Sequence, residues 1–194
     1  MKAKSVFVLM SLILSLALEF SCQQNSNRKI TNKITVAPTK KISLDSKLIE
    51  YLDTCFKGWT LPEANRWDSV WYNQYNYNGC YVNYLKGDFD CNNHDDYAMI
   101  FLNENNSLLA YAFLSQKNTF KKVLLLDLGK DTNQKIDFGL EMVTPGKIHY
   151  MDPESEDAPF VILKCCAIQI VNFEKGAETF YWESGKLKSV MTGD

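Results

Sequence analysis

Residues 80–102 read CYVNYLKGDFDCNNHDDYAMIFL, and this stretch decides the fold of the chain. Apolar and aromatic residues typical of β-strands occupy both of its ends, CYVNYL (80–85) and YAMIFL (97–102). The polar residues between them are rich in Asp and Asn, which favour turns because their side chains bond the local backbone. We therefore expect a loop that joins two β-strands.

This loop places oxygen-bearing side chains at alternate positions. Asp88, Asp90 and Asn92 stand at positions one, three and five, and Asp96 stands at position nine. His94, at position seven, would contribute its backbone carbonyl oxygen. Ca²⁺ takes about six to eight oxygen ligands, and alternate residues of a tight loop turn toward one centre. The pattern predicts a structural calcium site formed by these five residues.

Two positions separate this loop from an EF-hand. Asn93 stands where Gly is usual, and Asn is the next residue to tolerate a left-handed backbone. Met99 stands at position twelve in place of the bidentate Glu, and strand-forming segments replace the flanking helices. The alternative is a metal-free turn, closed only by Asp and Asn side chains bonding their own backbone.

The segment GDFDCNNHDDYAMIF (87–101) resembles the GDFNGDGKDDYAVLL segment of FG-GAP and VCBS-type repeats. The resemblance implies calcium ligands at Asp88, Asp90, Asn92 and Asp96. The segment occurs once, whereas a propeller requires several repeats. The closing segment (172–194) is similar to the ends of small uncharacterised bacterial proteins with one such loop. The resemblance implies an exported single domain and supplies no activity.

The N-terminus predicts export and a membrane anchor. Lys2 and Lys4 precede a thirteen-residue apolar run (6–18), which is typical of a signal peptide spanning residues 1–21 and is short for a bilayer span. A small residue followed by Cys22 and a polar run resembles a bacterial lipobox, which implies lipidation of Cys22. We expect a lipoprotein of the bacterial cell envelope, at the outer membrane or facing the periplasm. Ordinary signal cleavage is the alternative.

Charge divides the mature chain into two parts. Residues 22–41 carry five basic residues and no acid, and we expect them to form a disordered tether that favours an anionic membrane surface. Residues 42–194 carry 14 basic and 22 acidic residues, a net charge of −8, which argues against nucleic acid as a partner. This part is long enough for one domain with its own core.

Cysteine use agrees with export but leaves the pairing open. If Cys22 carries lipid, five cysteines remain, so at least one thiol is unpaired within the chain. A Cys80–Cys91 bridge could hold the start of the loop, and Cys55 could pair with Cys165 or Cys166. Free buried thiols are the alternative for all five. No C-x-x-C spacing occurs, which argues against a zinc or thioredoxin-type site.

The rest of the chain predicts an α+β fold that is mainly β: an antiparallel sheet or meander with one N-terminal helix. Apolar residues of 43–57 repeat at helical spacing, with Ser43 or Asp45 as the cap and Gly58 after the end. A short helix over 63–71 is expected next. Turns are expected at 103–107 and 183–185. The expected strands are 80–86, 97–102, 108–115, 119–127, 137–143, 147–151, 160–164, 167–173, 178–182 and 186–191.

Catalytic motifs are missing from the sequence. There are two histidines, His94 in the loop and His149 on an expected strand, and no G-x-S-x-G, H-E-x-x-H or glycine-rich phosphate loop. We expect His149 to be a surface or core residue. The acidic run of Asp152, Glu154, Glu156 and Asp157 is expected to be a solvated loop, with a second cation site as the alternative.

These observations predict a non-enzymatic exported lipoprotein, a calcium-stabilised β module that binds a partner in the cell envelope. One alternative is a periplasmic immunity or inhibitor protein, because an acidic surface complements basic toxins and lytic enzymes. A second is a glycan-binding or glycan-cleaving domain that uses the aromatic residues of 59–81. Packing is the simpler use of those aromatic side chains.

Overall fold

The computed structural model describes residues 42–75, 81–152, 154, 158–173 and 175–193. The expected signal peptide (1–21), the tether (22–41) with Cys22, and Cys80 lie outside these residues. Within the described residues no helix is both long and apolar enough to span a membrane.

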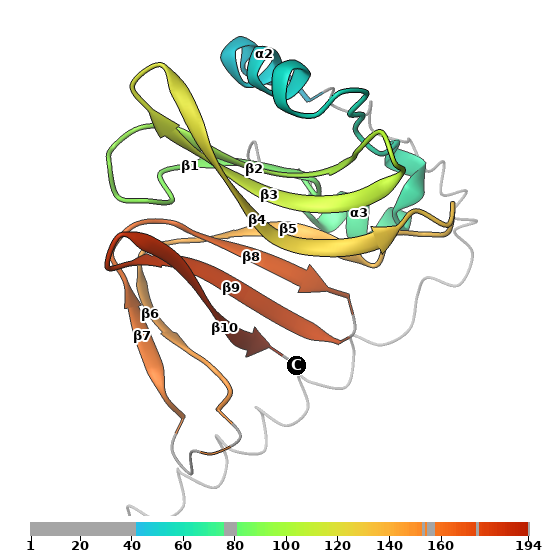
Figure 1. Ribbon diagram of the computed structural model, residues 1–194. Helices are drawn as coiled ribbons and strands as arrows, with labels where there is room; N and C mark the ends of the chain where they lie inside the picture. The colour runs from blue at the N-terminus through green and yellow to red at the C-terminus, as the bar shows by residue number, and fades with distance from the viewer. Residues whose placement is uncertain (1–41, 76–80, 153, 155–157, 174, 194) are drawn as a thin grey trace, which may run out of the picture. The chain divides into compact units, whose positions relative to one another are not determined.

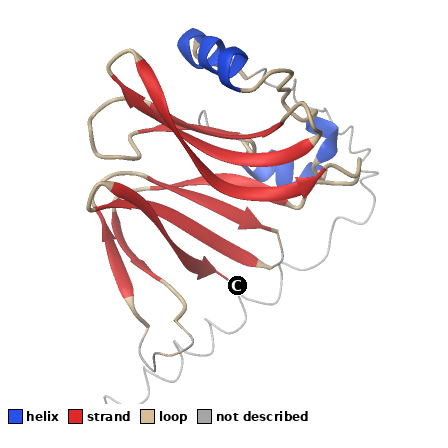
Figure 2. Cartoon of the chain, in the orientation of Figure 1, coloured by secondary structure: helices blue, strands red, loops and turns tan. Residues whose placement is uncertain are grey.

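Strands dominate the described chain (Figure 2), and the helical elements precede them in the sequence. The elements are α2 (Ser46–Cys55), the 3₁₀ turn η1 (Ala64–Arg66), α3 (Ser69–Tyr75), β1 (Tyr84–Gly87), β2 (Asp96–Leu102), β3 (Ser107–Gln116), β4 (Thr119–Lys130), β5 (Phe138–Val143), β6 (Gly146–His149), β7 (Phe160–Leu163), β8 (Ala167–Asn172), β9 (Gly176–Glu183) and β10 (Lys186–Gly193). The mainly-β fold with antiparallel sheets is confirmed.

The strands form three antiparallel sheets (Figure 1). The first sheet is a meander in the order β1-β2-β3-β4, and the second has the order β10-β9-β8-β5. Strands β6 and β7 form a separate two-stranded sheet, and in the chain they lie between β5 and β8 of the second sheet. Each of the ten expected strands is present, with ends shifted by up to a few residues, as at β1.

The main core lies between the first and second sheets. Alternate residues of a strand point to opposite faces, and Ala98 and Ile100 of β2 pack with Leu140, Ile168 and Phe180 from the second sheet. All five side chains are buried. The two four-stranded sheets therefore form a sandwich, an arrangement that the strand pattern alone does not specify.

The opposite face of the first sheet is covered by α2. Leu48 and Leu52 are fully buried against Tyr97, Met99 and Phe101, the other alternating set of β2. The strand is thus buried on both faces, which explains why its sequence is almost continuously apolar.

Asp45, one of the two expected capping residues, is the N-cap of α2. The Asp45 carboxylate accepts a hydrogen bond from the Lys47 N–H at 2.9 Å. Two members of the expected apolar stripe do not face inward, because Ile49 and Cys55 are exposed. Helical spacing predicts that a helix has an apolar face, but the packing partner, here the first sheet, decides how many residues of that face are buried.

The aromatic segment before β1 is used for packing. Trp67 is buried and its indole N–H donates to the Phe138 carbonyl at 2.7 Å, while Trp71 stacks on Phe173 with ring centroids 4.7 Å apart. Trp59 packs in the core beneath α2. The expected single helix over 63–71 is instead the turn η1 followed by α3. Packing thus accounts for three of the tryptophans in this segment, whereas Tyr77 lies outside the described residues.

The remaining polar features are exposed. His149 lies on β6, with Nδ1 3.2 Å from the Ala158 carbonyl oxygen. Asp152 and Glu154 are exposed, whereas Glu156 and Asp157 lie outside the described residues. At 183–185 the expected turn is present, with positive φ at Ser184 and Gly185 as a two-residue hairpin connection requires.

Candidate metal centre

The Asp-rich loop connects β1 to β2, so the expectation that it joins two strands is confirmed. Gly87, the last residue of β1, lies opposite Asp96, the first residue of β2. The loop is therefore carried by two paired strands of the first sheet. A rigid base of this kind holds side chains in place better than an unsupported loop does.

Side chains of the loop bond its own backbone. The Asp88 carboxylate accepts hydrogen bonds from the N–H groups of Asn92 (3.1 Å) and Asn93 (3.0 Å). Asn92 Oδ1 accepts from the His94 N–H at 2.7 Å. Cys91 and Asn93 both have φ of 61°, so the left-handed conformation expected at Asn93 is present and a second one precedes it.

Phe89 anchors the loop in the core between the sheets. Its side chain is fully buried, and Gly87 allows this position because a Cβ on Gly87 would lie 3.1 Å from the Phe89 ring and 3.2 Å from the Met142 sulfur. A larger residue at position 87 would have to displace one of these side chains.

Asp96 is a fully buried carboxylate that joins the loop to β3. Its Oδ2 accepts from the Phe89 N–H at 2.8 Å, and its Oδ1 accepts from the Ser115 N–H at 2.6 Å. Burial raises the pKa of Asp96 to about 6, with a smaller contribution from the charges of Asp90 and Asp88, although the two backbone hydrogen bonds oppose the shift.

The three carboxylates converge on one point. One ligand oxygen from each of Asp88, Asp90 and Asp96 lies within 4.8 Å of the others. Two unit charges about 4 Å apart repel by about 4 kcal/mol at an effective dielectric constant of about 20. In the part of the chain that the structure describes, Asp90 Oδ1 is buried and has no hydrogen-bond partner. Burial and the Asp88 charge raise the pKa of Asp90. Among the described residues, none of the three carboxylates forms an ion pair.

This donor set fits a hard cation. Two ligands that are each about 2.4 Å from one calcium ion can be at most about 4.8 Å apart, which the three carboxylates satisfy. Each carboxylate oxygen that accepts one N–H retains a second lone pair, and Asp90 Oδ1 retains both. Oxygen donors on a loop of irregular geometry favour Ca²⁺ over Mg²⁺, which demands a stricter octahedron, and over Zn²⁺, which prefers nitrogen and sulfur.

The other two expected ligands lie beside the cluster. Asn92 is half-buried, and its Nδ2 donates to the Ser115 carbonyl at 3.0 Å, while its Oδ1, which accepts from the His94 N–H, retains a second lone pair for a cation. His94 is exposed, and its imidazole is not a member of the carboxylate cluster. Only its backbone carbonyl was expected to bind, and that role stays a prediction.

A disulfide fixes the outer side of the loop. Cys91 is bonded to Cys165, 74 residues later in the turn between β7 and β8, with a Cα–Cα distance of 5.3 Å. The expected Cys80–Cys91 and Cys55–Cys165 bridges are therefore wrong. Cys55–Cys166 is also wrong, because both thiols are free. Sequence separation does not indicate which segments the sandwich brings together.

Ser115 is the residue of this centre that the sequence did not reveal. It lies near the end of β3, where its backbone bonds Asn92 and Asp96 and its hydroxyl donates to the Asp95 carbonyl. Three loop residues thus form hydrogen bonds with one residue of strand β3. A Ser at the end of a strand carries no signal for such a contact, because the contact uses mostly backbone groups.

No family model, no curated protein and no solved structure matches this chain. The resemblance of residues 87–101 to FG-GAP and VCBS-type repeats stays a prediction, and the centre is interpreted from its geometry.

The buried Asp96 carboxyl predicts an unusual pH dependence of stability without metal. Its folded pKa of about 6 lies above the ordinary value of 3.8, so the folded protein binds the proton more tightly than the unfolded chain does. Its contribution is therefore greatest in acid and is lost as the pH rises through 6, by about 2 to 3 kcal/mol. Urea unfolding in EDTA at about pH 5 and about pH 7.5 measures the upper half of this change, about 1 to 1.5 kcal/mol, because the other half falls between the ordinary pKa of 3.8 and pH 5.

Asp96→Asn is the comparison for this experiment. The variant should lose stability overall, but its change between the two pH values should lack the contribution of Asp96. Parallel pH profiles for the two proteins would contradict the assignment.

The Cys91–Cys165 disulfide is expected to stabilise the folded protein. Replacing both Cys91 and Cys165 with Ala should lower the free energy of unfolding by about 2 to 5 kcal/mol, because the bridge closes a long loop in the unfolded chain. It should also weaken calcium binding, because the bridge ties the cation loop at Cys91 to the turn between β7 and β8. Denaturant unfolding and calcium titration measure the two effects. Cys55→Ser, at an exposed free thiol, is the control and should change neither.

Proposed function

We propose that this protein is a non-enzymatic, lipid-anchored module of the bacterial cell envelope, whose Asp-rich loop binds Ca²⁺ as a structural ion and whose β-sandwich binds a partner there. The observation that carries the proposal is the convergence of Asp88, Asp90 and Asp96 around the unpartnered Asp90 oxygen. A bound cation would neutralise their repulsion and supply that missing partner.

Export is supported by two independent features. The N-terminal residues have the pattern of a signal peptide followed by Cys22, and the Cys91–Cys165 disulfide belongs in an oxidising compartment. Because Cys91 lies within the cation loop, an oxidising compartment is also the one in which the bridge can form and stabilise this loop.

The surroundings of the two histidines give no support to a catalytic role. Both are exposed, and neither forms an ion pair with an acidic residue in the described parts of the chain. A histidine that acts as a general base is normally oriented by a third group such as a carboxylate. The proposal of a binding module rests instead on the β-sandwich and the cation loop that it carries.

Calcium should raise the stability of the purified protein. At a concentration about 100-fold above its Kd, an ion that binds only the folded state adds about 2 to 3 kcal/mol, which corresponds to a rise in Tm of about 5–10 °C. Asp88→Asn and Asp90→Asn should each remove most of this rise, because each removes a charged ligand. Differential scanning calorimetry in excess calcium and in EDTA is the measurement.

Asp95→Asn provides the matched control within the same loop. Asp95 is exposed and pairs with Lys86 at 2.8 Å instead of joining the cluster. This variant should keep the full response to calcium. Identical melting curves of the unsubstituted protein in calcium and in EDTA would refute the structural role of the ion.

The anchor makes a separate prediction. Cys22→Ser should leave export intact but release the protein from the membrane fraction, because a Ser at this position cannot be lipidated. Fractionation of expressing cells, with metabolic labelling by a fatty acid, tests this. An unsubstituted protein that carries no label and appears in the soluble envelope fraction would contradict lipidation and favour ordinary signal cleavage.

A further inference from the structure

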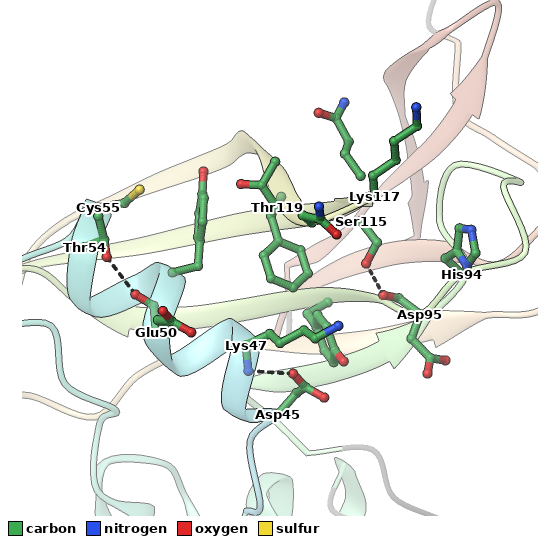
Figure 3. Close-up of a pocket in the computed structure, with 15 residues that line it drawn as sticks. Asp45, Lys47, Glu50, Thr54, Cys55, His94, Asp95, Ser115, Lys117 and Thr119 are labelled. Carbon is green, nitrogen blue, oxygen red and sulfur yellow. Dashed lines mark hydrogen bonds between the residues drawn. The ribbon is translucent and has the colours of Figure 1, made fainter.

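A polar groove borders the cation loop (Figure 3). It lies between the N-terminal cap and outer face of α2, residues 94–97 at the end of the loop, and residues 115–120 at the turn between β3 and β4. Its volume is about 720 Å³, within the usual range for sites that hold a small ligand. We call it the helix–hairpin groove.

Aromatic rings form the apolar part of the groove. Tyr51 of α2 and Phe120 of β4 pack edge to face with centroids 5.4 Å apart, and Tyr97 contacts Phe120 at 5.7 Å. Tyr51 and Phe120 are only half-buried, so part of each ring remains accessible on the groove side. Accessible rings can pack against a flat apolar surface of a ligand.

Most of the remaining lining is polar and almost balanced in charge. Three carboxylates, on Asp45, Glu50 and Asp95, oppose two lysines, Lys47 and Lys117. Two of the carboxylates are already engaged, since Asp45 caps α2 and Asp95 pairs with Lys86. In Figure 3, Lys47 extends from α2 across the groove, whereas Lys117 points away from α2.

The composition of this lining favours one class of ligand. The near balance of charge creates no strong field of either sign that would select an anion or a cation. Carboxylate, amide and hydroxyl groups on the rim, including Glu50, Asn118 and Thr119, are exposed and suited to hydrogen-bonding hydroxyl groups. A pyranose ring combines such hydroxyl groups with an apolar face.

We propose that the helix–hairpin groove is a binding site for a neutral saccharide. The apolar face of the sugar packs on Tyr51 and Phe120, and its hydroxyl groups bond Glu50 and Asn118. This inference rests on the proposed function, because it names the ligand class of the envelope-binding module. It uses rings on α2 and β4, not the aromatic segment before β1.

The groove is connected to the cation loop through Ser115. Asn92, Asp95 and Asp96 all bond this residue, and Ser115 lines the groove directly before the β3–β4 turn. His94 and Asp95 line the groove as well. A cation that orders the loop therefore also fixes one wall of the groove. Calcium and saccharide should each raise the affinity for the other by the same factor.

The test uses the purified mature protein and an array of neutral, acidic and basic oligosaccharides, followed by calorimetric titration of each ligand that binds. We expect a neutral oligosaccharide to bind, with affinity several-fold higher in excess calcium than in EDTA. The double variant Glu50→Gln, Asn118→Ala should weaken binding by about tenfold, because a charged acceptor becomes neutral at position 50 and the Asn118 amide is lost. Phe120→Leu should weaken binding through loss of the ring.

Glu104→Gln, Asn105→Ala is the matched control. It changes the same residue types in the exposed turn between β2 and β3, outside the groove, and should leave saccharide binding unchanged. Calorimetric melting in calcium verifies that every variant is folded.

Three results would overturn the inference: an array on which no neutral saccharide binds, binding confined to charged glycans, or equal loss of affinity in the groove variant and the control. A protein that calcium stabilises but no neutral saccharide binds would refute the groove assignment and leave the structural role of calcium intact. Saccharide binding of equal strength in calcium and in EDTA would refute the coupling through Ser115.

Discussion

The structure depends on one buried carboxylate, that of Asp96. Two backbone N–H groups hold it, one from Phe89 in the loop and one from Ser115 on β3, and it has no exposed surface. A buried charge is costly unless it is paired, and two neighbouring carboxylates increase that cost. The arrangement is therefore favourable either with a proton on the cluster or with a cation bound to it.

The two covered faces of the first sheet give the loop its rigidity. The side chains of β2 alternate between the core beneath α2 and the core between the sheets, so this strand has no solvent-exposed face. Asp96 begins that strand, and Phe89 enters the inter-sheet core directly. A cation site built on such a base needs little reorganisation to bind its ion, because the surrounding structure already positions three of its ligands.

The same loop contacts two parts of the molecule that are distant in sequence. On one side Cys91 bonds Cys165 in the turn before β8, and on the other Ser115 at the end of β3 is held by three loop residues. The loop thus connects both sheets of the sandwich. Ser115 directly precedes the β3–β4 turn, and these contacts are the physical basis on which we link ion binding to the helix–hairpin groove.

Local chemistry was enough to predict the strands, the capped helix and the position of the Asp-rich loop. Strand and helix periods, turn residues and the spacing of Asp88, Asp90 and Asp96 are all properties of neighbouring residues in the chain. The tertiary structure alone decided the pairing of Cys91 with Cys165, the exposure of Ile49 and Cys55, the contacts of Ser115 and the existence of the groove. Each of these depends on which segments the two sheets and α2 bring together, and burial between distant segments leaves no regular spacing in the sequence.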